Sequence, residues 1–194
     1  MKKQLVTAVL MTAVTTVLLG LMYPLVITGL AQLLFPEKAN GQLMYRNGRA
    51  VGSRLIGQPF TGPGYFRSRP SAAGAGYDAA TSGGSNLAPT NQKLIRRVQD
   101  AVARASTENP AQPIPIDLVT ASASGLDPDI SPAAAYFQVP RVASERGLSE
   151  QKVRELIRRS TYRRQFGVLG EPRVNLLQLN LLLLDEVSQG RPAD

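Results

Sequence analysis

The chain is 194 residues long, carries a formal net charge of +8 and contains neither histidine nor cysteine. These two absences remove the commonest general base, the thiolate nucleophile and most ligands of zinc and iron, so the composition argues against most enzyme classes. The surplus of positive charge suits an acidic partner, acidic lipid or nucleic acid. No fold signature of a nucleic-acid-binding protein accompanies it, and we expect no nucleic-acid partner.

Residues 5–34 contain no charged side chain and directly follow Lys2 and Lys3. About 20 apolar residues suffice to cross a bilayer as a helix, whereas the apolar part of a signal peptide is only about 7–15 residues long. The pattern favours an uncleaved anchor over a cleaved signal peptide. Basic residues flank the run on both sides and do not decide its orientation. We expect residues 1–4 to be a cytoplasmic tail, because a short tail is easily kept inside and long domains translocate largely regardless of their charge. Residues 35–194 would then form one soluble domain outside the cytoplasm.

Pro24 interrupts this apolar run and predicts a kink near residues 20–23, because proline removes a backbone donor. Gly20, Gly29 and several threonines provide small and hydroxylic surfaces along the helix. Such residues let membrane helices pack closely. The run is therefore either a bent but isolated anchor or a helix that docks against others.

The soluble part has the signals of an α+β domain with a small antiparallel or mixed sheet. Asn47-Gly48, flanked by apolar residues, predicts a hairpin over residues 42–51. The alternating, β-branched segment 114–120 predicts a further strand, which Pro115 would confine to a sheet edge.

Four segments predict helices. Residues 94–105 have an apolar stripe with Arg96, Arg97, Asp100 and Arg104 outside it, which is typical of an amphipathic surface helix. Ser131-Pro132 is a helix start, and Pro140 must end or restart that helix. Ser149 caps a helix over residues 150–160. The leucine-rich segment 175–187 is either the central core helix or half of an interface.

Three segments have the residue types of a binding site, each with a structural alternative. Asp127-Pro128-Asp129 supplies too few oxygen ligands for a cation, and a capped turn is favoured over a metal site. The glycine-rich segment 81–86 lacks the ending of a P-loop, so a structural loop is favoured over a phosphate cradle. Residues 62–70 mix aromatic rings with arginines and could stack on nucleic acid or dock a protein.

A basic stripe is either a solvated helix face or a partner surface, and it consists of Arg154, Arg158, Arg159, Arg163 and Arg164.

Several words of the sequence, in order and along nearly the whole chain, closely resemble the C subunit of Kdp potassium-transporting ATPases. They are Tyr23-Pro-Leu-Val-Ile-Thr-Gly29, the segment 57–71, Tyr77-Asp78, Ser82-Gly-Gly-Ser-Asn-Leu87, Ser124-Gly-Leu-Asp-Pro128, Ile130-Ser-Pro132, Gly170-Glu-Pro-Arg-Val-Asn175 and Leu179-Asn180. The resemblance implies a non-catalytic accessory subunit of a bacterial inner-membrane complex that imports potassium at the expense of ATP. Its partners would be a channel-like potassium-binding subunit, a P-type ATPase subunit and a small helical subunit.

The resemblance also implies roles for individual residues. The family is described as a catalytic chaperone that raises the ATP affinity of the ATPase subunit, and Gln151, in the matching Leu148-Ser-Glu-Gln151 stretch, would touch nucleotide in a ternary complex. No cofactor would be tightly bound. Membrane docking is expected at Tyr23, Pro24, Thr28 and Gly29. The candidate partner contacts are Tyr65, Phe66, Arg67, Arg69, Asn86 and Asp127.

A domain outside the cytoplasm cannot meet cytoplasmic ATP directly, although it could change ATP affinity through allosteric coupling. It would then lie over the potassium entrance. The alternative is a nucleotide-binding module on the cytoplasmic side, with Gln151 and the loop 82–86 as contacts.

Overall fold

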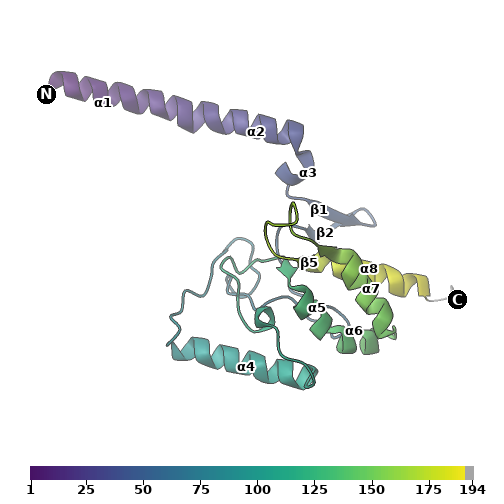
Figure 1. Ribbon diagram of the computed structural model, residues 1–194. Coiled ribbons are helices and arrows are strands. Elements are labelled where there is room, and N and C mark those ends of the chain that lie inside the picture. The colour runs from purple at the N-terminus through teal and green to yellow at the C-terminus, as the bar shows by residue number, and fades with distance from the viewer. Residues whose placement is uncertain (191–194) are drawn as a thin grey trace. The chain divides into compact units, whose positions relative to one another are not determined.

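The computed structural model describes residues 1–190 of the chain, which divides into two compact units, Met1–Val51 and Gly52–Asp194. The architecture is α+β, as predicted, with one long apolar helix near the amino terminus followed by helices and small sheets (Figure 1). The predicted boundary between the anchor and the soluble domain lies elsewhere, between residues 34 and 35, and it stays a prediction.

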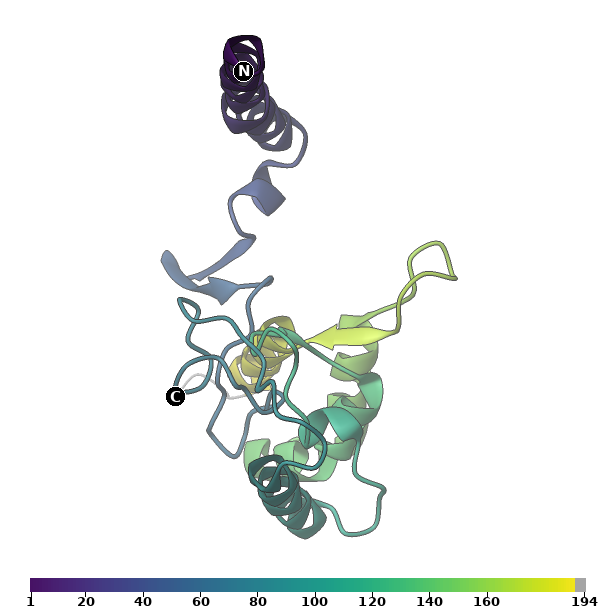
Figure 2. The same ribbon diagram turned by 90° about the vertical axis from the view of Figure 1, so that its left-hand side faces the viewer.

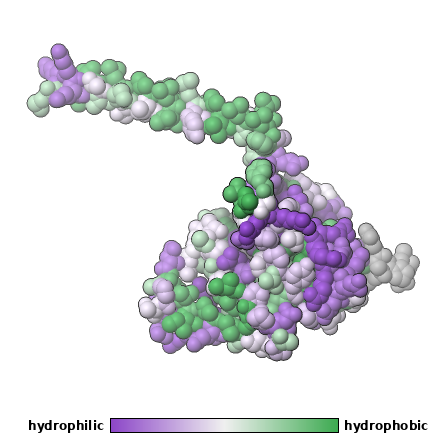
Figure 3. All heavy atoms as spheres, viewed as in Figure 1, coloured by the Kyte–Doolittle hydropathy of each residue, from purple (hydrophilic) through white to green (hydrophobic). Residues whose placement is uncertain are grey.

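The first unit begins with a helix over Lys2–Leu34 that is long and apolar enough to cross a membrane. It consists of α1 (Lys2–Thr15), a π-helical segment η1 (Thr16–Met22) and α2 (Tyr23–Leu34). Figure 3 shows hydrophobic side chains along its length. The predicted single apolar helix is confirmed.

Three hydroxyl groups of this helix have hydrogen-bond partners in its own backbone. The hydroxyls of Thr7, Thr12 and Thr15 donate to backbone carbonyls four residues earlier, at 2.8–2.9 Å. Pro24 lies at the start of α2, directly after the π-helical segment. A proline cannot donate to the helical ladder, and a wider π turn is a common local adjustment. The irregularity expected near residues 20–23 is therefore a π-helical segment.

A short helix, α3 (Pro36–Ala39), and a hairpin of β1 (Leu43–Arg46) and β2 (Arg49–Ser53) follow the anchor. Asn47 and Gly48 at its turn have φ values of 51° and 74°. Two consecutive positive φ values define the tight turn that an Asn-Gly pair favours. The predicted hairpin is confirmed.

The second unit packs helices around a three-stranded antiparallel sheet of order β3-β5-β4. The strands are only two or three residues long: β3 (Asp129–Ile130), β4 (Thr161–Tyr162) and β5 (Arg173–Asn175). Its helices are α4 (Gln92–Glu108), η2 (Ile116–Leu118), α5 (Pro132–Phe137), α6 (Val139–Arg146), α7 (Glu150–Ser160) and α8 (Leu176–Gly190). Figure 2 shows these elements from a second side.

The helix starts read from the sequence are confirmed. Ser131 accepts a hydrogen bond from the Ala134 amide at the start of α5, and Ser149 accepts one from the Lys152 amide at the start of α7. Pro140 lies in the first turn of α6, where its missing amide hydrogen costs nothing. Leu179 and Leu183 of α8 are fully buried in the core, which supports the core-helix interpretation of the leucine-rich segment.

The predicted strand over residues 114–120 is wrong. This segment forms the 3-10 helix η2, in which the Leu118 and Val119 amides donate to the carbonyls of Pro115 and Ile116. The Asp117 side chain is buried and accepts hydrogen bonds from the Ser131 amide at 2.7 Å and the Ser131 hydroxyl at 3.1 Å. A turn aims Asp117 at the start of α5, whereas sheet pairing would hold this backbone extended.

Residues 54–91, all of which the structure describes, contain neither helix nor strand, and side chains hold this segment in place. The Asn180 amide accepts from the Phe66 amide at 2.9 Å and donates to the Phe66 carbonyl at 3.0 Å. Gln138 binds the Arg67 backbone in the same way, at 2.7 and 3.2 Å. We call these two pairs the amide clamps. They replace the ladder hydrogen bonds that a strand would make, because buried backbone groups need partners.

Candidate functional site

The predicted nucleotide contact, Gln151, is exposed in the first turn of α7. Leu148 and Val153 pack into the core on either side of the Ser149 cap and fix the start of this helix. Gln151 borders an open hollow of about 280 Å³, which is lined by Ser149, Gln151, Lys152, Glu155 and Arg158. A helix amino terminus with an amide side chain is a suitable setting for an anion.

The charges around this hollow are already paired. Lys152 Nζ lies 2.8 Å from Glu186 Oε2, and Arg158 forms an ion pair with Glu155. Both cations that line the hollow are therefore compensated. A phosphate would have to compete with carboxylates for them, which weakens the site electrostatically.

The basic stripe is compensated in the same manner at three further positions. Arg154 pairs with Glu150 at 3.1 Å, Arg159 lies 3.9 Å from Glu186, and Arg164 binds both oxygens of Glu171 at 2.7 and 2.8 Å. Exposed pairs of this kind contribute only about 0–1 kcal/mol each, but they reduce the net field of the stripe.

The amide clamps bind the backbones of Phe66 and Arg67 in the segment 65–67. Phe66 is fully buried in the core, so its ring stabilises the fold. A partner that approaches this segment would contact Tyr65 and Arg67 instead. The Tyr65 ring lies 5.9 Å from the ring of Phe60, and the Arg146 guanidinium lies 4.4 Å from its centre. Arg67 Nη1 lies 3.4 Å from Glu108 Oε2.

Arg141 ties this segment to the helices. Its guanidinium donates to Glu108 Oε1 at 2.7 Å, to the Tyr65 carbonyl at 2.9 Å and to Gln138 Oε1 at 2.7 Å. Sequence reasoning missed Arg141, because its partners come from three separate segments. The arrangement makes Arg141 the centre of a charged network beneath the candidate partner contacts.

Arg69 and Asp127, both predicted as partner contacts, bind one another at 3.0 Å. Asp127 also accepts from the Asp129 amide at 3.1 Å, which is the turn interpretation of Asp127-Pro128-Asp129. Within residues 1–190, no three histidine, cysteine, aspartate or glutamate side chains come together as a cation site.

Asn86, another predicted partner contact, is exposed and has a positive φ of 50°. It ends the glycine-rich loop, in which the Gly83 amide donates to the Ser124 carbonyl at 2.8 Å and the Ser82 hydroxyl donates to the same oxygen at 3.0 Å. The Gly83 amide thus joins two loops, as expected of a structural loop.

Asp129 has a perturbed acidity. Burial raises the pKa of its carboxyl above the ordinary value of 3.8, and a hydrogen bond from Asn175 and the charge of Arg173 oppose this only in part. The Asn175 amide lies 3.1 Å from Asp129 Oδ1, and Arg173 Nε lies 2.9 Å from Oδ2. Asp129 thereby joins β3 to β5.

The predicted docking residues lie in α2. Tyr23 and Pro24 begin this helix, and Thr28 and Gly29 follow one turn later. A Cβ atom added to Gly29 would meet nothing within 4 Å in this chain, so the glycine leaves open space on the helix surface. Such a surface allows close approach of a second membrane helix.

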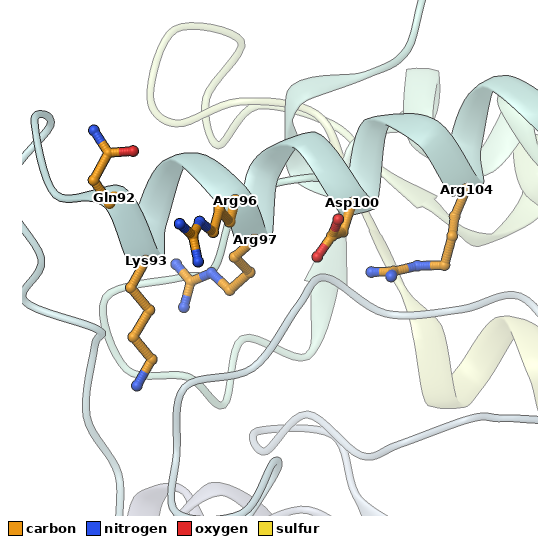
Figure 4. A pocket seen from close by; sticks show the side chains of 6 residues that line it. All are labelled: Gln92, Lys93, Arg96, Arg97, Asp100 and Arg104. Carbon is orange, nitrogen blue, oxygen red and sulfur yellow. The ribbon is translucent and has the colours of Figure 1, made fainter.

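A larger hollow, of about 590 Å³, lies along α4 and was not predicted. Figure 4 shows its lining side chains extending from one helix: Gln92, Lys93, Arg96, Arg97, Asp100 and Arg104. Four cations against one carboxylate favour an anionic neighbour. The amphipathic pattern predicted this helix, but side chains that splay around a hollow leave no trace in sequence periodicity.

Comparison with known proteins identifies the family. Residues 5–185 match the family described as KdpC, the c chain of K+-transporting ATPase. A potassium-transporting ATPase KdpC subunit of Koribacter versatilis is 65% identical, over 93% of this chain and 94% of the relative. KdpC subunits of Acidobacterium capsulatum and Rhodopseudomonas palustris are 62% and 52% identical, covering 91% and 94% of this chain and 95% and 98% of the relatives. The chain therefore belongs to the KdpC family of potassium-transporting ATPase subunits.

Proposed function

We propose that this accessory subunit assembles the potassium importer through its anchor and raises the ATP affinity of the ATPase subunit without binding ATP directly. The observation that carries the proposal is the continuous helix Lys2–Leu34, which contains no charge between residues 5 and 34 and is followed by a polar domain. Hydrolysis would lie on another chain, in keeping with a sequence that has no histidine or cysteine.

The proposed orientation has the amino terminus in the cytoplasm and the domain outside it, over the potassium entrance of the channel-like subunit. Basic residues flank the span on both sides, so the orientation rests on the short tail before it and on the tendency of long domains to translocate regardless of their charge. ATP affinity would then change by coupling, which requires the domain to contact two states of the complex differently. Such coupling typically amounts to about 5–150-fold in affinity.

A cysteine at Asn47 tests the orientation, because the chain has no other cysteine to label. Asn47 lies in the turn of the β1–β2 hairpin. We expect an impermeant thiol reagent to label N47C in intact cells with a permeabilised outer membrane and to leave it unlabelled in sealed inverted vesicles. Labelling only in inverted vesicles would place the domain in the cytoplasm and overturn the proposal.

The docking role of the anchor is tested by Gly29→Leu. The helix itself has room for the side chain, so loss of co-purification with the other subunits would report lost packing between helices. Ala8→Leu, an exposed small residue of α1, is the matched control. Normal recovery of the complex with G29L would show that this face does not dock.

The second candidate function is direct nucleotide binding beside Gln151, which the hollow at the start of α7 favours. It predicts that the purified full-length chain binds ATP in calorimetry and that Gln151→Ala weakens this binding. Gln99→Ala, an exposed amide on α4, is the control. Absence of heat with the wild-type chain would eliminate direct binding in isolation and leave the allosteric proposal standing.

A further inference from the structure

The hairpin that joins β4 to β5 exposes an apolar tip. Phe166 is 92% exposed, Val168 71% and Leu169 57%, although each is a residue type that is commonly buried. Residues 165–169 are called the hairpin tip. In the second unit, the connection between β4 and β5 extends away from the helices in both ribbon views (Figures 1 and 2).

Backbone hydrogen bonds order the hairpin tip. Gln165 and Leu169 exchange two backbone hydrogen bonds of 2.9 Å, and the Gly167 amide donates to the Arg164 carbonyl at 3.2 Å. Below the tip, Arg164 grips both oxygens of Glu171 across the hairpin. A tip that is ordered before binding loses little conformational entropy when it docks.

Phe166 also adopts an uncommon backbone conformation, with a φ of 53°. A positive φ is a true outlier for a bulky residue, and such strain persists where the surrounding structure enforces it. Here the turn holds the ring of Phe166 in solvent, and no residue among 1–190 buries it. The strain and the exposed ring together indicate a surface shaped for contact with something outside the chain.

The charges beside the tip describe its partner. Arg164 is neutralised by Glu171, whereas Arg163 is exposed and forms no ion pair with a described residue. A membrane surface attracts clusters of about 4–8 basic residues, whereas two of the three arginines of this hairpin are paired, Arg164 with Glu171 and Arg173 with Asp129. One aromatic anchor, two aliphatic neighbours and one free cation instead fit a pocket on a protein, with an apolar floor and a carboxylate at its rim.

We infer that the hairpin tip is a docking element that inserts Phe166 into an apolar, acid-rimmed pocket on another subunit of the complex. The inference rests on the proposed function and adds to it a contact outside the anchor. Phe166 would be the buried anchor, Val168 and Leu169 would exclude water around it, and Arg163 would pair with the rim carboxylate.

Competition between wild-type and variant full-length chains for the remaining subunits tests the inference. We expect Phe166→Ser to lose about thirtyfold in apparent affinity, as is common for an aromatic anchor, and Phe166→Leu to recover most of it. Ile116→Ser is the matched control, because Ile116 is 73% exposed on η2 and should change affinity less than threefold. Circular dichroism melting of each chain confirms that the domain stays folded.

A unique label distinguishes the possible occupants. Gln165→Cys, in a chain without other cysteines, takes an environment-sensitive fluorophore beside Phe166. The expected result is a blue shift only when the other subunits join the labelled chain in nanodiscs. A shift in nanodiscs without them would assign the tip to the bilayer, and a shift that depends on the density of labelled chains would assign it to a second copy. Either result overturns the inference.

Failure of the inference and failure of the proposed function have different signatures. If wild-type chain does not assemble with the other subunits, the accessory function itself is wrong. If wild-type chain assembles and F166S competes equally well, the accessory function stands and only the docking role of the tip is refuted.

Discussion

Replacing Asn180 by alanine should destabilise the domain strongly, because this side chain closes one of the amide clamps. Asn180 is 1% exposed and supplies both hydrogen bonds to the Phe66 backbone, at 2.9 and 3.0 Å. Phe66 itself is fully buried, so N180A leaves one N–H and one C=O without partners inside the core.

The magnitude follows from those two groups. A buried polar group that loses its partner costs about 1–3 kcal/mol, so the pair costs about 2–6 kcal/mol. A domain of this kind has a total stability of only about 5–15 kcal/mol. At about 2–4 °C per kcal/mol, the melting temperature should fall by roughly 5–20 °C.

Chemical denaturation of the full-length chain in detergent, followed by circular dichroism, measures this loss. Gln178→Ala is the control, because Gln178 lies on the same helix and its amide accepts from the exposed Tyr162 hydroxyl at 2.7 Å. We expect Q178A to stay within about 0.5 kcal/mol of wild type, as is usual for surface changes. If N180A costs no more than Q178A, water or a shifted backbone satisfies Phe66, and the clamp does not hold the loop.

Three further predictions concern the carboxyl of Asp129 in the sheet and the start of α5. Burial raises the pKa of Asp129, so this carboxyl contributes most to the free energy of unfolding below pH 3.8. The contribution is lost as the pH rises through the folded-state pKa. Asp129→Asn should remove this pH dependence from denaturation curves. Removing the Arg173 charge with Arg173→Ala should raise the Asp129 pKa further in an NMR titration, and an unchanged or lower pKa would contradict the assigned cause. Ser131→Ala removes the cap of α5 and should cost about 1–2 kcal/mol in thermal melts, whereas Ser131→Thr should retain most of it.

Features that depend on neighbours in sequence were predictable. The apolar run predicted the transmembrane helix, Asn47-Gly48 predicted the hairpin turn, and Ser131-Pro132 predicted the start of α5. Each of these signals is complete within a few residues, because a turn, a cap or a transmembrane helix satisfies its backbone groups locally.

Features that depend on contacts between residues far apart in the sequence were not predictable. Phe66 is a predicted partner contact, yet its side chain is buried in the core and its backbone is bound by Asn180, 114 residues away. The segment 114–120 alternates like a strand, but Asp117 turns inward to Ser131 and the chain forms a 3-10 helix. The strands β3, β4 and β5 are too short to leave a periodic pattern.

The candidate site divides in the same way. Gln151 was predicted because it lies in a segment that resembles the family, and the structure adds the hollow beside it. Arg141 and the hairpin tip were not found, since the importance of Arg141 arises from three segments that meet in space and that of the tip from exposure, which no single window of sequence reveals.

The π-helical segment Thr16–Met22 has a consequence for which sides of the helix its two halves present. An α-helix turns by about 100° per residue, and a π turn accommodates one extra residue, so everything after the segment is out of angular phase with everything before it. Residues that would share one stripe on an uninterrupted helix are thereby directed to different sides. The half that carries Gly29 and the half that carries Thr7 therefore direct their small and hydroxylic side chains to different sides of the span.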